Sequence, residues 1–289
     1  MVGKQGNRGP VQKTPRMRMS RVLLVAGLVA SLLVPAAGSP AVGQVQQLPN
    51  LVPLPPRDVI IGAPDDDRFG PPVGALRFAT AVANRSSYAF DLFGQAENPL
   101  AQSARAMQCV RWATQRVCQE RKDVGRIVWH PEHAHHHLED FALYELRKLK
   151  KNGRPNLKPA GLVAGGTKVS FCLMDIEPDD GTSPGLFGLG YPLYMSCAAG
   201  SGFQGISAGW RDVYSNGTSG QQVPLEGVPD GIYALVVTSD PVGLLLETSK
   251  TDNIAVTGVE LSEGATKVKV VCESAPGTTQ CLPVEAPPT

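Results

Sequence analysis

Short segments in which apolar and polar side chains alternate constrain the fold more than any other feature of this sequence. Alternation with a period of two is typical of strands, and Gly, Pro, Asn and Asp separate the segments here as they do in turns. Only residues 101–121 look helical. The pattern predicts a mostly β fold with little helix, a single β-sandwich-like domain with long loops. Strands are expected at 76–82, 124–130, 141–146, 168–174, 232–238, 253–260 and 266–272.

The first 41 residues have the order of a secretory signal peptide: six basic and no acidic side chains, the apolar run 22–33, then small residues. A membrane anchor is the alternative, but twelve apolar residues are too few to cross ~30 Å of hydrocarbon as a helix. We therefore predict a secreted protein with no membrane segment in its mature form. The predicted organisation is a signal peptide at 1–41, a Pro-rich lead-in at 42–68 and one domain at 69–289.

The charge balance changes when the predicted signal peptide is removed. The chain has 27 basic and 26 acidic residues, and the six basic residues of the signal peptide leave 21 against 26. A mildly acidic mature chain lacks the basic surface expected of a nucleic-acid binder, so no nucleic-acid partner is predicted. It agrees with cationic substrates, although a near-neutral surface without such a role is equally common.

Six cysteines in an exported chain predict a domain stapled by disulfides. Six cysteines allow fifteen pairings. Short loops favour Cys109 with Cys118 and Cys272 with Cys281, and elimination then leaves Cys172 with Cys197.

All five histidines lie within eight residues, 130–137. The preceding residues 126–129 read as a strand, and a strand that continues places His133, His135 and His137 on one face. His130 and His136 then fall on the other side. A helix would instead align His130, His133 and His137. Because protonated rings side by side repel each other, the cluster predicts neutral imidazoles that bind one metal ion.

The ligand types leave the metal open. Imidazole ligands suit zinc, copper, nickel or iron, and the general affinity order favours copper. A cupin site is one alternative, since His133, His135 and Glu139 have the spacing of its first motif. A cupin needs a further histidine downstream, and none follows His137. The cupin interpretation therefore fails.

Four blocks of sequence, in order, resemble the lysyl oxidase family. The first is Trp129-His130 with the three alternate histidines, followed by Phe141-x-x-Tyr144-x-Leu146. The second is GTKVSFCLMD at 166–175, and the third is GWRDVY at 209–214. The last comprises VPDGIY at 228–233 with the stretch from Glu247 to Ile254. The similarity covers roughly residues 50–260, and the absence of a visible accessory domain suggests a minimal, bacterial form.

The resemblance implies a catalytic domain with two cofactors. Copper(II) would be bound by His133, His135 and His137, and Lys168 would join Tyr214 to form lysine tyrosylquinone. The implied reaction is oxidative deamination of peptidyl lysine or another primary amine by O₂, which yields an aldehyde, hydrogen peroxide and ammonia. Addition of Lys168 to the oxidised ring requires a neutral, desolvated amine.

Further roles follow from the same resemblance. Asp212 is the candidate general base, with a turn-stabilising role as the alternative. Glu247, Asp252 and Asn253 fall where some members bind calcium, although Ser249 replaces an acidic residue there. The sequence also departs from animal members, since Glu132 replaces a cysteine and Leu143 a histidine.

Three hypotheses therefore compete. The first is a secreted amine oxidase, and the second is a non-enzymatic extracellular copper- or zinc-binding protein on the same scaffold. The third is a purely structural, disulfide-stapled β domain, which the histidine cluster disfavours. The first two differ in one covalent bond, between Lys168 and Tyr214.

Overall fold

A computed structural model of the chain describes residues 46–63, 74–95, 102–112, 117–131, 134–166, 168–179, 192–197 and 203–284. All of them belong to one compact unit, Gly43–Thr289. They form β-strands and one short 3-10 helix, η2 (Pro159–Gly161), and no helix among them is long and apolar enough to span a membrane. The predicted signal peptide lies outside the described residues.

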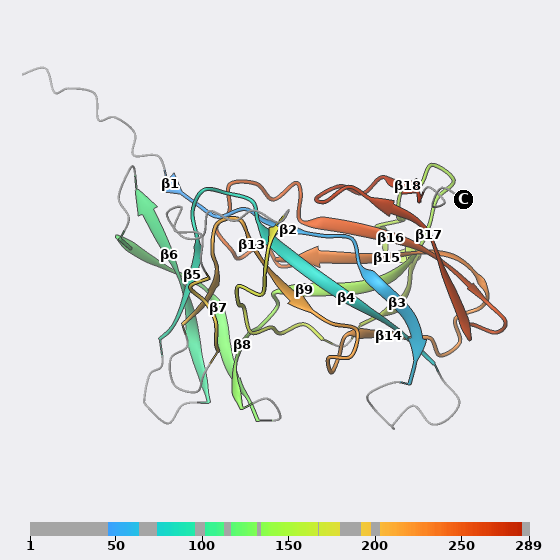
Figure 1. Cartoon of the computed structure of the whole chain (residues 1–289), viewed down its shortest axis with the longest axis horizontal. Coiled ribbons are helices and arrows are strands. Elements are labelled where there is room, and N and C mark those ends of the chain that lie inside the picture. Colours follow the sequence, from blue (N-terminus) through green and yellow to red (C-terminus); the bar gives the residue numbers. More distant parts are fainter. Residues whose placement is uncertain are drawn as a thin grey trace, which may run out of the picture. The chain divides into compact units, whose positions relative to one another are not determined.

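The first sheet carries the four histidines that the structure describes. Figure 1 shows most of its strands. Its strands are antiparallel and follow the order β12 (Gln204–Ile206), β5 (Phe90–Gln95), β6 (Ser103–Trp112), β7 (Glu120–His130) and β8 (His135–Leu138), with β1 (Gln46–Gln47) beside β6.

The helix predicted at 101–121 is wrong, because the described residues of this segment include β6 and the start of β7. In β6 the alternate residues Ala106, Gln108 and Val110 are fully buried. Gln108 pairs with β5 on one side and with β7 on the other. Sheet pairing on both sides thus overrides a weak local helix preference.

The second sheet contains four of the predicted strands. Its order is β10 (Leu162–Gly165), β9 (Ala142–Lys148), β15 (Gly231–Ser239), β16 (Ile254–Ser262), β17 (Lys267–Ser274) and β18 (Cys281–Pro283), all antiparallel.

The third sheet is built around β4, whose ten residues are all buried. Its order is β11 (Glu177–Pro178), β13 (Trp210–Tyr214), β4 (Ala75–Asn84) and β14 (Gln222–Pro224), and β2 (Leu51–Pro53) and β3 (Arg57–Gly62) also pair with β4. Part of the predicted lead-in is therefore paired in the sheet. The domain boundaries stay predictions.

The predicted strand at 168–174 forms no ladder. Its one bridge joins Phe171 to Leu138 at the end of β8. The segment is extended and crosses from the first sheet toward β13, since the hydroxyl of Tyr214 contacts Cys172. This position makes it a link between the histidines and β13.

The three sheets share one core, and three disulfides secure it. Phe78 of β4, Phe90 of β5, Tyr144 of β9 and Leu235 of β15 belong to a single buried cluster. The disulfides are Cys109–Cys118, Cys172–Cys197 and Cys272–Cys281. The predicted mostly β, disulfide-stapled fold and all three pairings are confirmed.

Candidate functional site

The histidine cluster forms a hairpin rather than one continuous strand. β7 ends at His130, the chain turns, and β8 begins at His135, which pairs with His130. Pro131 cannot donate a ladder hydrogen bond, and Ala134 has a φ of 54°, so both favour a turn here. His133, one of the three predicted ligands, lies outside the described residues.

The hairpin sorts the remaining histidines between two faces. Directly paired residues in antiparallel strands share a face, so His130 lies on the side of His135 and His137, not opposite as an unbroken strand would place it. The rings of His130 and His137 stack with centroids 4.7 Å apart. His136 faces the other way, and its ring lies 5.1 Å from that of Trp129.

Two imidazoles converge on one point. The Nε2 atoms of His135 and His137 are 2.9 Å apart, and the ring of His137 is almost fully buried. Two such nitrogens can bind one ion at the usual distance of about 2 Å. Among the described residues no set of three metal-binding side chains gathers.

Ser170 supports this pair from the neighbouring segment. Its Oγ lies 3.2 Å from Nδ1 of His137, the nitrogen that does not face His135. A polar group on the second ring nitrogen fixes the orientation of a metal-binding imidazole. Two backbone hydrogen bonds between Leu138 and Phe171, of 2.7 and 3.0 Å, hold the segment in place.

The same segment brings Lys168 to Tyr214. Lys168 is buried, with 9% exposure, and its Nζ lies 5.2 Å from the centroid of the Tyr214 ring and 5.1 Å from that of Phe171. Lys168 packs against Gly220. A Cβ at position 220 would lie only 2.9 Å from the Cβ of Lys168, so a larger residue there would crowd the lysine. The two predicted cofactor residues are therefore neighbours.

The backbone of Cys172 holds the phenol of Tyr214 in a fixed orientation. The hydroxyl donates to the carbonyl of Cys172 at 2.6 Å and accepts from its N–H at 2.9 Å. The ring meets Phe171 edge to face, with centroids 5.1 Å apart. Burial raises the pKa of Tyr214 well above its usual value, and the nearby Asp212 raises it further.

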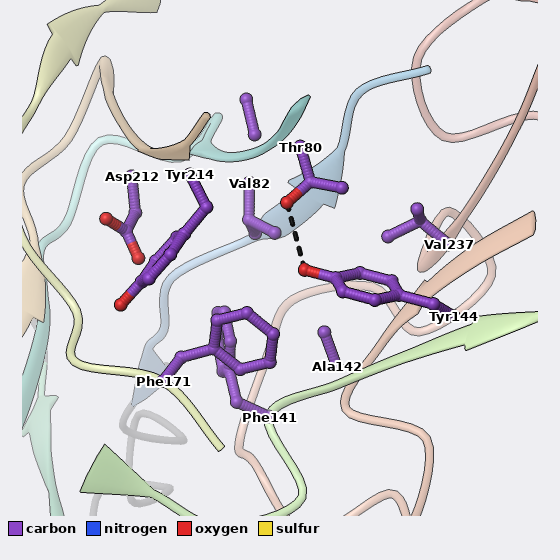
Figure 2. Close-up of a pocket in the computed structure, with 10 residues that line it drawn as sticks. Thr80, Val82, Phe141, Ala142, Tyr144, Phe171, Asp212, Tyr214 and Val237 are labelled. Carbon is purple, nitrogen blue, oxygen red and sulfur yellow. Dashed lines mark hydrogen bonds between the residues drawn. The ribbon is translucent and has the colours of Figure 1, made fainter. Parts of the chain in front are cut away.

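Asp212 lies on the same face of β13 as Tyr214, and both line a cavity of about 10 Å³, the space of one water molecule (Figure 2). Asp212 is 3% exposed, and burial raises the pKa of its carboxyl well above the usual value. Hydrogen bonds from the backbone of Met174 and Val213 oppose this rise. Its Oδ1 has no hydrogen-bond partner among the described residues.

A buried polar network on the cavity wall was not predicted from the sequence. The hydroxyl of Tyr144 lies 2.9 Å from Oγ1 of Thr80, as Figure 2 shows, and accepts from Nε2 of Gln221 at 3.0 Å. Burial raises the pKa of Tyr144. Tyr144 belongs to the motif Phe141-x-x-Tyr144-x-Leu146, the only sequence signal that marked it.

A second cluster of polar side chains joins the loop before β16 to residues 50 and 51, at the start of β2. Glu247 accepts from Leu51 N–H at 2.8 Å and from Asn253 Nδ2 at 3.0 Å, and Asn50 Nδ2 donates to Asp252 at 2.8 Å. The remaining Oδ1 atoms of Asn50, Asp252 and Asn253 are buried without a hydrogen-bond partner among the described residues. Three such oxygens are the ligand type that calcium prefers.

The region that contains the candidate site is similar to known proteins. A family model described as lysyl oxidase matches residues 96–272, a range that contains every predicted copper, cofactor and base residue. Protein-lysine 6-oxidase of Homo sapiens is 32% identical over 127 residues, 44% of this chain and 26% of that protein. The Sus scrofa protein of that name is 31% identical over 44% of this chain and 43% of its own length. Lysyl oxidase homolog 3A of Danio rerio is 35% identical over 44% of this chain and 15% of its own length. In each case the match spans less than half of the relative.

Proposed function

Because the chain belongs to the lysyl oxidase family, we propose that it is a secreted copper- and quinone-dependent amine oxidase. Its substrate would be peptidyl lysine or another primary amine, and its products an aldehyde, hydrogen peroxide and ammonia. The observation that carries the proposal is the buried contact of Lys168 with the ring of Tyr214. Secretion is supported by the N-terminal segment and the three disulfides.

We assign the copper ligands to His133, His135 and His137. The convergent nitrogens of His135 and His137, with Ser170 on the outer nitrogen of His137, fit a copper ion. When bound, copper with O₂ supplies the oxidising power that converts the phenol of Tyr214 to a quinone. A zinc ion would fit the same nitrogens but is redox-inactive.

The chain itself orients the two cofactor residues. The paired hydrogen bonds from Cys172 fix the phenol, and Phe171 fixes the plane of its ring. Lys168 is buried beside this ring, and its addition to the oxidised ring requires the neutral amine. The proximity of this amine to the ring supports the proposal that the two residues form lysine tyrosylquinone.

Asp212 is the proposed general base, because it is buried beside Tyr214 and keeps one carboxylate oxygen without a hydrogen-bond partner among the described residues. Such an oxygen can accept the α-proton of a bound amine. Since burial raises the pKa of the carboxyl, the active carboxylate fraction increases with pH. Activity should therefore increase with pH until Asp212 is ionised.

We expect Asp212→Asn to lower kcat by about 10²–10⁴-fold, the usual contribution of a general base. The variant should also lose the rise of kcat with pH, because its side chain does not ionise. Peroxide release from a primary amine, measured across pH, tests both effects. An Asp212→Asn variant that keeps the wild-type pH profile would assign Asp212 a structural role instead.

Peroxide release with a carbonyl reagent tests the proposed activity directly. Copper-matured protein should release peroxide from a primary amine, and phenylhydrazine should abolish the release by reacting with the quinone carbonyl. Release that phenylhydrazine does not affect would exclude a quinone. A protein that binds copper and releases no peroxide would favour the non-enzymatic metal-binding alternative.

We further propose calcium at the cluster of Asn50, Glu247, Asp252 and Asn253. Burial raises the pKa of Glu247 to about 7, so at alkaline pH the folded chain holds a buried carboxylate that a cation would neutralise. The three buried oxygens without partners among the described residues point to the same ligand. The ion would fasten the chain before β2 to the loop before β16.

Calcium should therefore raise the Tm more at pH 8 than at pH 5. The folded pKa of Glu247 is raised, so without a cation its contribution to stability falls as pH rises from about 4.5 to about 7, by about 3 kcal/mol for such a shift. Calcium binds the ionised form and offsets this loss. Thermal unfolding with calcium or a chelator measures it, and Asn253→Ala should lose the response. Equal stabilisation at both pH values, or in the variant, would contradict the site.

A further inference from the structure

Five exposed cationic side chains lie together at the end of β9 and on the segment that follows it. We call this segment, residues 148–158, the basic turn, and it contains no acidic residue. The five side chains are those of Lys148, Lys150, Lys151, Arg154 and Lys158. The rest of the chain contains 22 basic and 26 acidic residues, so the basic turn is a positive patch on a chain that is otherwise acidic.

The basic turn is firmly held. Within it, Lys150 N–H donates to the carbonyl of Arg154 and Gly153 N–H to that of Lys150, both at 2.9 Å. Cys281 N–H donates to the carbonyl of Gly153 at 2.8 Å, so the turn is fixed to β18 and through it to the disulfide Cys272–Cys281. Gly153 has a φ of +72°, and a Cβ there would lie 2.6 Å from the carbonyl oxygen of Cys281.

The five charges are not neutralised within the described part of the chain. None of them forms an ion pair with a described residue, whereas the neighbouring Arg147 pairs with Glu145 at 2.6 Å. Like charges at this density repel each other, and a firm turn cannot relieve the repulsion by spreading apart. An external anion would both neutralise the charges and release counterions.

We propose that the basic turn binds a linear polysaccharide that carries sulfate or phosphate groups. Four of the five cations are lysines. A lysine ammonium acts as a point charge, whereas an arginine guanidinium can form two parallel hydrogen bonds to one anion. The lysines therefore suit a polymer with repeated anionic groups more than a single small anion of defined shape. A flexible polymer can reach all five side chains around a turn, while a rigid DNA duplex cannot follow it.

The basic turn and the candidate active site lie at opposite ends of β9. Ala142, the first residue of the strand, lines the cavity beside Asp212 and Tyr214, and Lys148 is the last residue of the strand. Six residues of strand span about 20 Å. A polymer on the turn would therefore leave the site open, and the inference does not depend on the proposed oxidase activity.

Binding to heparin, a sulfated polysaccharide, tests the proposal in the full-length mature protein. The quadruple variant Lys148→Gln, Lys150→Gln, Lys151→Gln and Lys158→Gln should bind about tenfold more weakly or worse. Its slope of log K against log salt should be smaller by about 3, because four fewer charges displace counterions. The matched control replaces four exposed cations elsewhere, Lys122, Arg126, Lys267 and Lys269, and should bind as the wild type does.

The outcomes separate the alternatives. The proposal would be overturned if both variants lost heparin affinity equally, or if the quadruple variant lost none. It would also be overturned if the wild-type protein did not bind heparin at low salt. Duplex DNA that binds more tightly than heparin, and that also loses affinity for the quadruple variant, would make nucleic acid the partner.

If the quadruple variant fails to fold, lysine acetylation of the wild type replaces it. Heparin should then protect the four lysines of the basic turn but not Lys269.

Discussion

Tyr214→Phe will release no peroxide, and copper-matured wild-type protein will contain a covalent link between Lys168 and Tyr214. The link is expected because Lys168 Nζ lies 5.2 Å from the centroid of the tyrosine ring in a buried site. Phenylalanine has no hydroxyl and cannot be converted to the quinone, so the loss of activity should be complete rather than partial. Peptide mapping by mass spectrometry detects the link, and a peroxide assay measures the loss.

Matched variants separate chemistry from folding. Tyr233→Phe removes another buried phenol, whose hydroxyl donates to Pro229 at 2.8 Å, and should keep the link and the activity. Lys168→Arg keeps a cation but removes the primary amine, and should abolish the link. Separate, unmodified peptides containing Lys168 and Tyr214, from protein that nevertheless releases peroxide, would exclude this pair as the cofactor.

The pairing of Lys168 with Tyr214 shows what sequence patterns can and cannot predict. The two residues are far apart in the chain, and no periodicity relates them, so only the family resemblance joined them. In the structure the contact arises because the extended segment at 168–172 bridges to Leu138 while β13 pairs with β4. Contacts of this kind depend on tertiary packing, which local patterns do not encode.

Local chemistry explains which predictions were confirmed. Cysteines nine residues apart can close a hairpin, as Cys109 with Cys118 and Cys272 with Cys281 do. The period of two identified the central strands β4, β9, β15 and β16. It could not reveal the hydrogen bonds among Thr80, Tyr144 and Gln221, because these residues come from three separate segments.

In the histidine cluster, the turn at Pro131 changes which side chains share a face of the sheet. Alternation correctly placed His135 and His137 on one face, but it assumed that the strand continues through Pro131. The turn there folds β8 back on β7, which brings His130 to the same face and stacks it on His137. The face therefore separates His136 from the pair His135 and His137, but it does not separate His130 from them.

His135→Ala should consequently lose bound copper and form no quinone, whereas His136→Ala should keep both. The two residues are neighbours in β8, but successive side chains of a strand point to opposite faces. The Nε2 of His135 lies 2.9 Å from that of His137, while His136 packs against Trp129. Copper content after dialysis, and the copper electron paramagnetic resonance spectrum, measure the difference.

Ser170→Ala provides a graded version of the same experiment. It removes the hydroxyl 3.2 Å from Nδ1 of His137 and leaves every proposed ligand in place, so copper affinity should fall by about 10–100-fold without complete loss.

Equal copper loss in the His135→Ala and His136→Ala variants would indicate that copper binding requires the hairpin as a whole and not the face that carries His135. A quinone that forms normally in His135→Ala would refute the proposed ligand set.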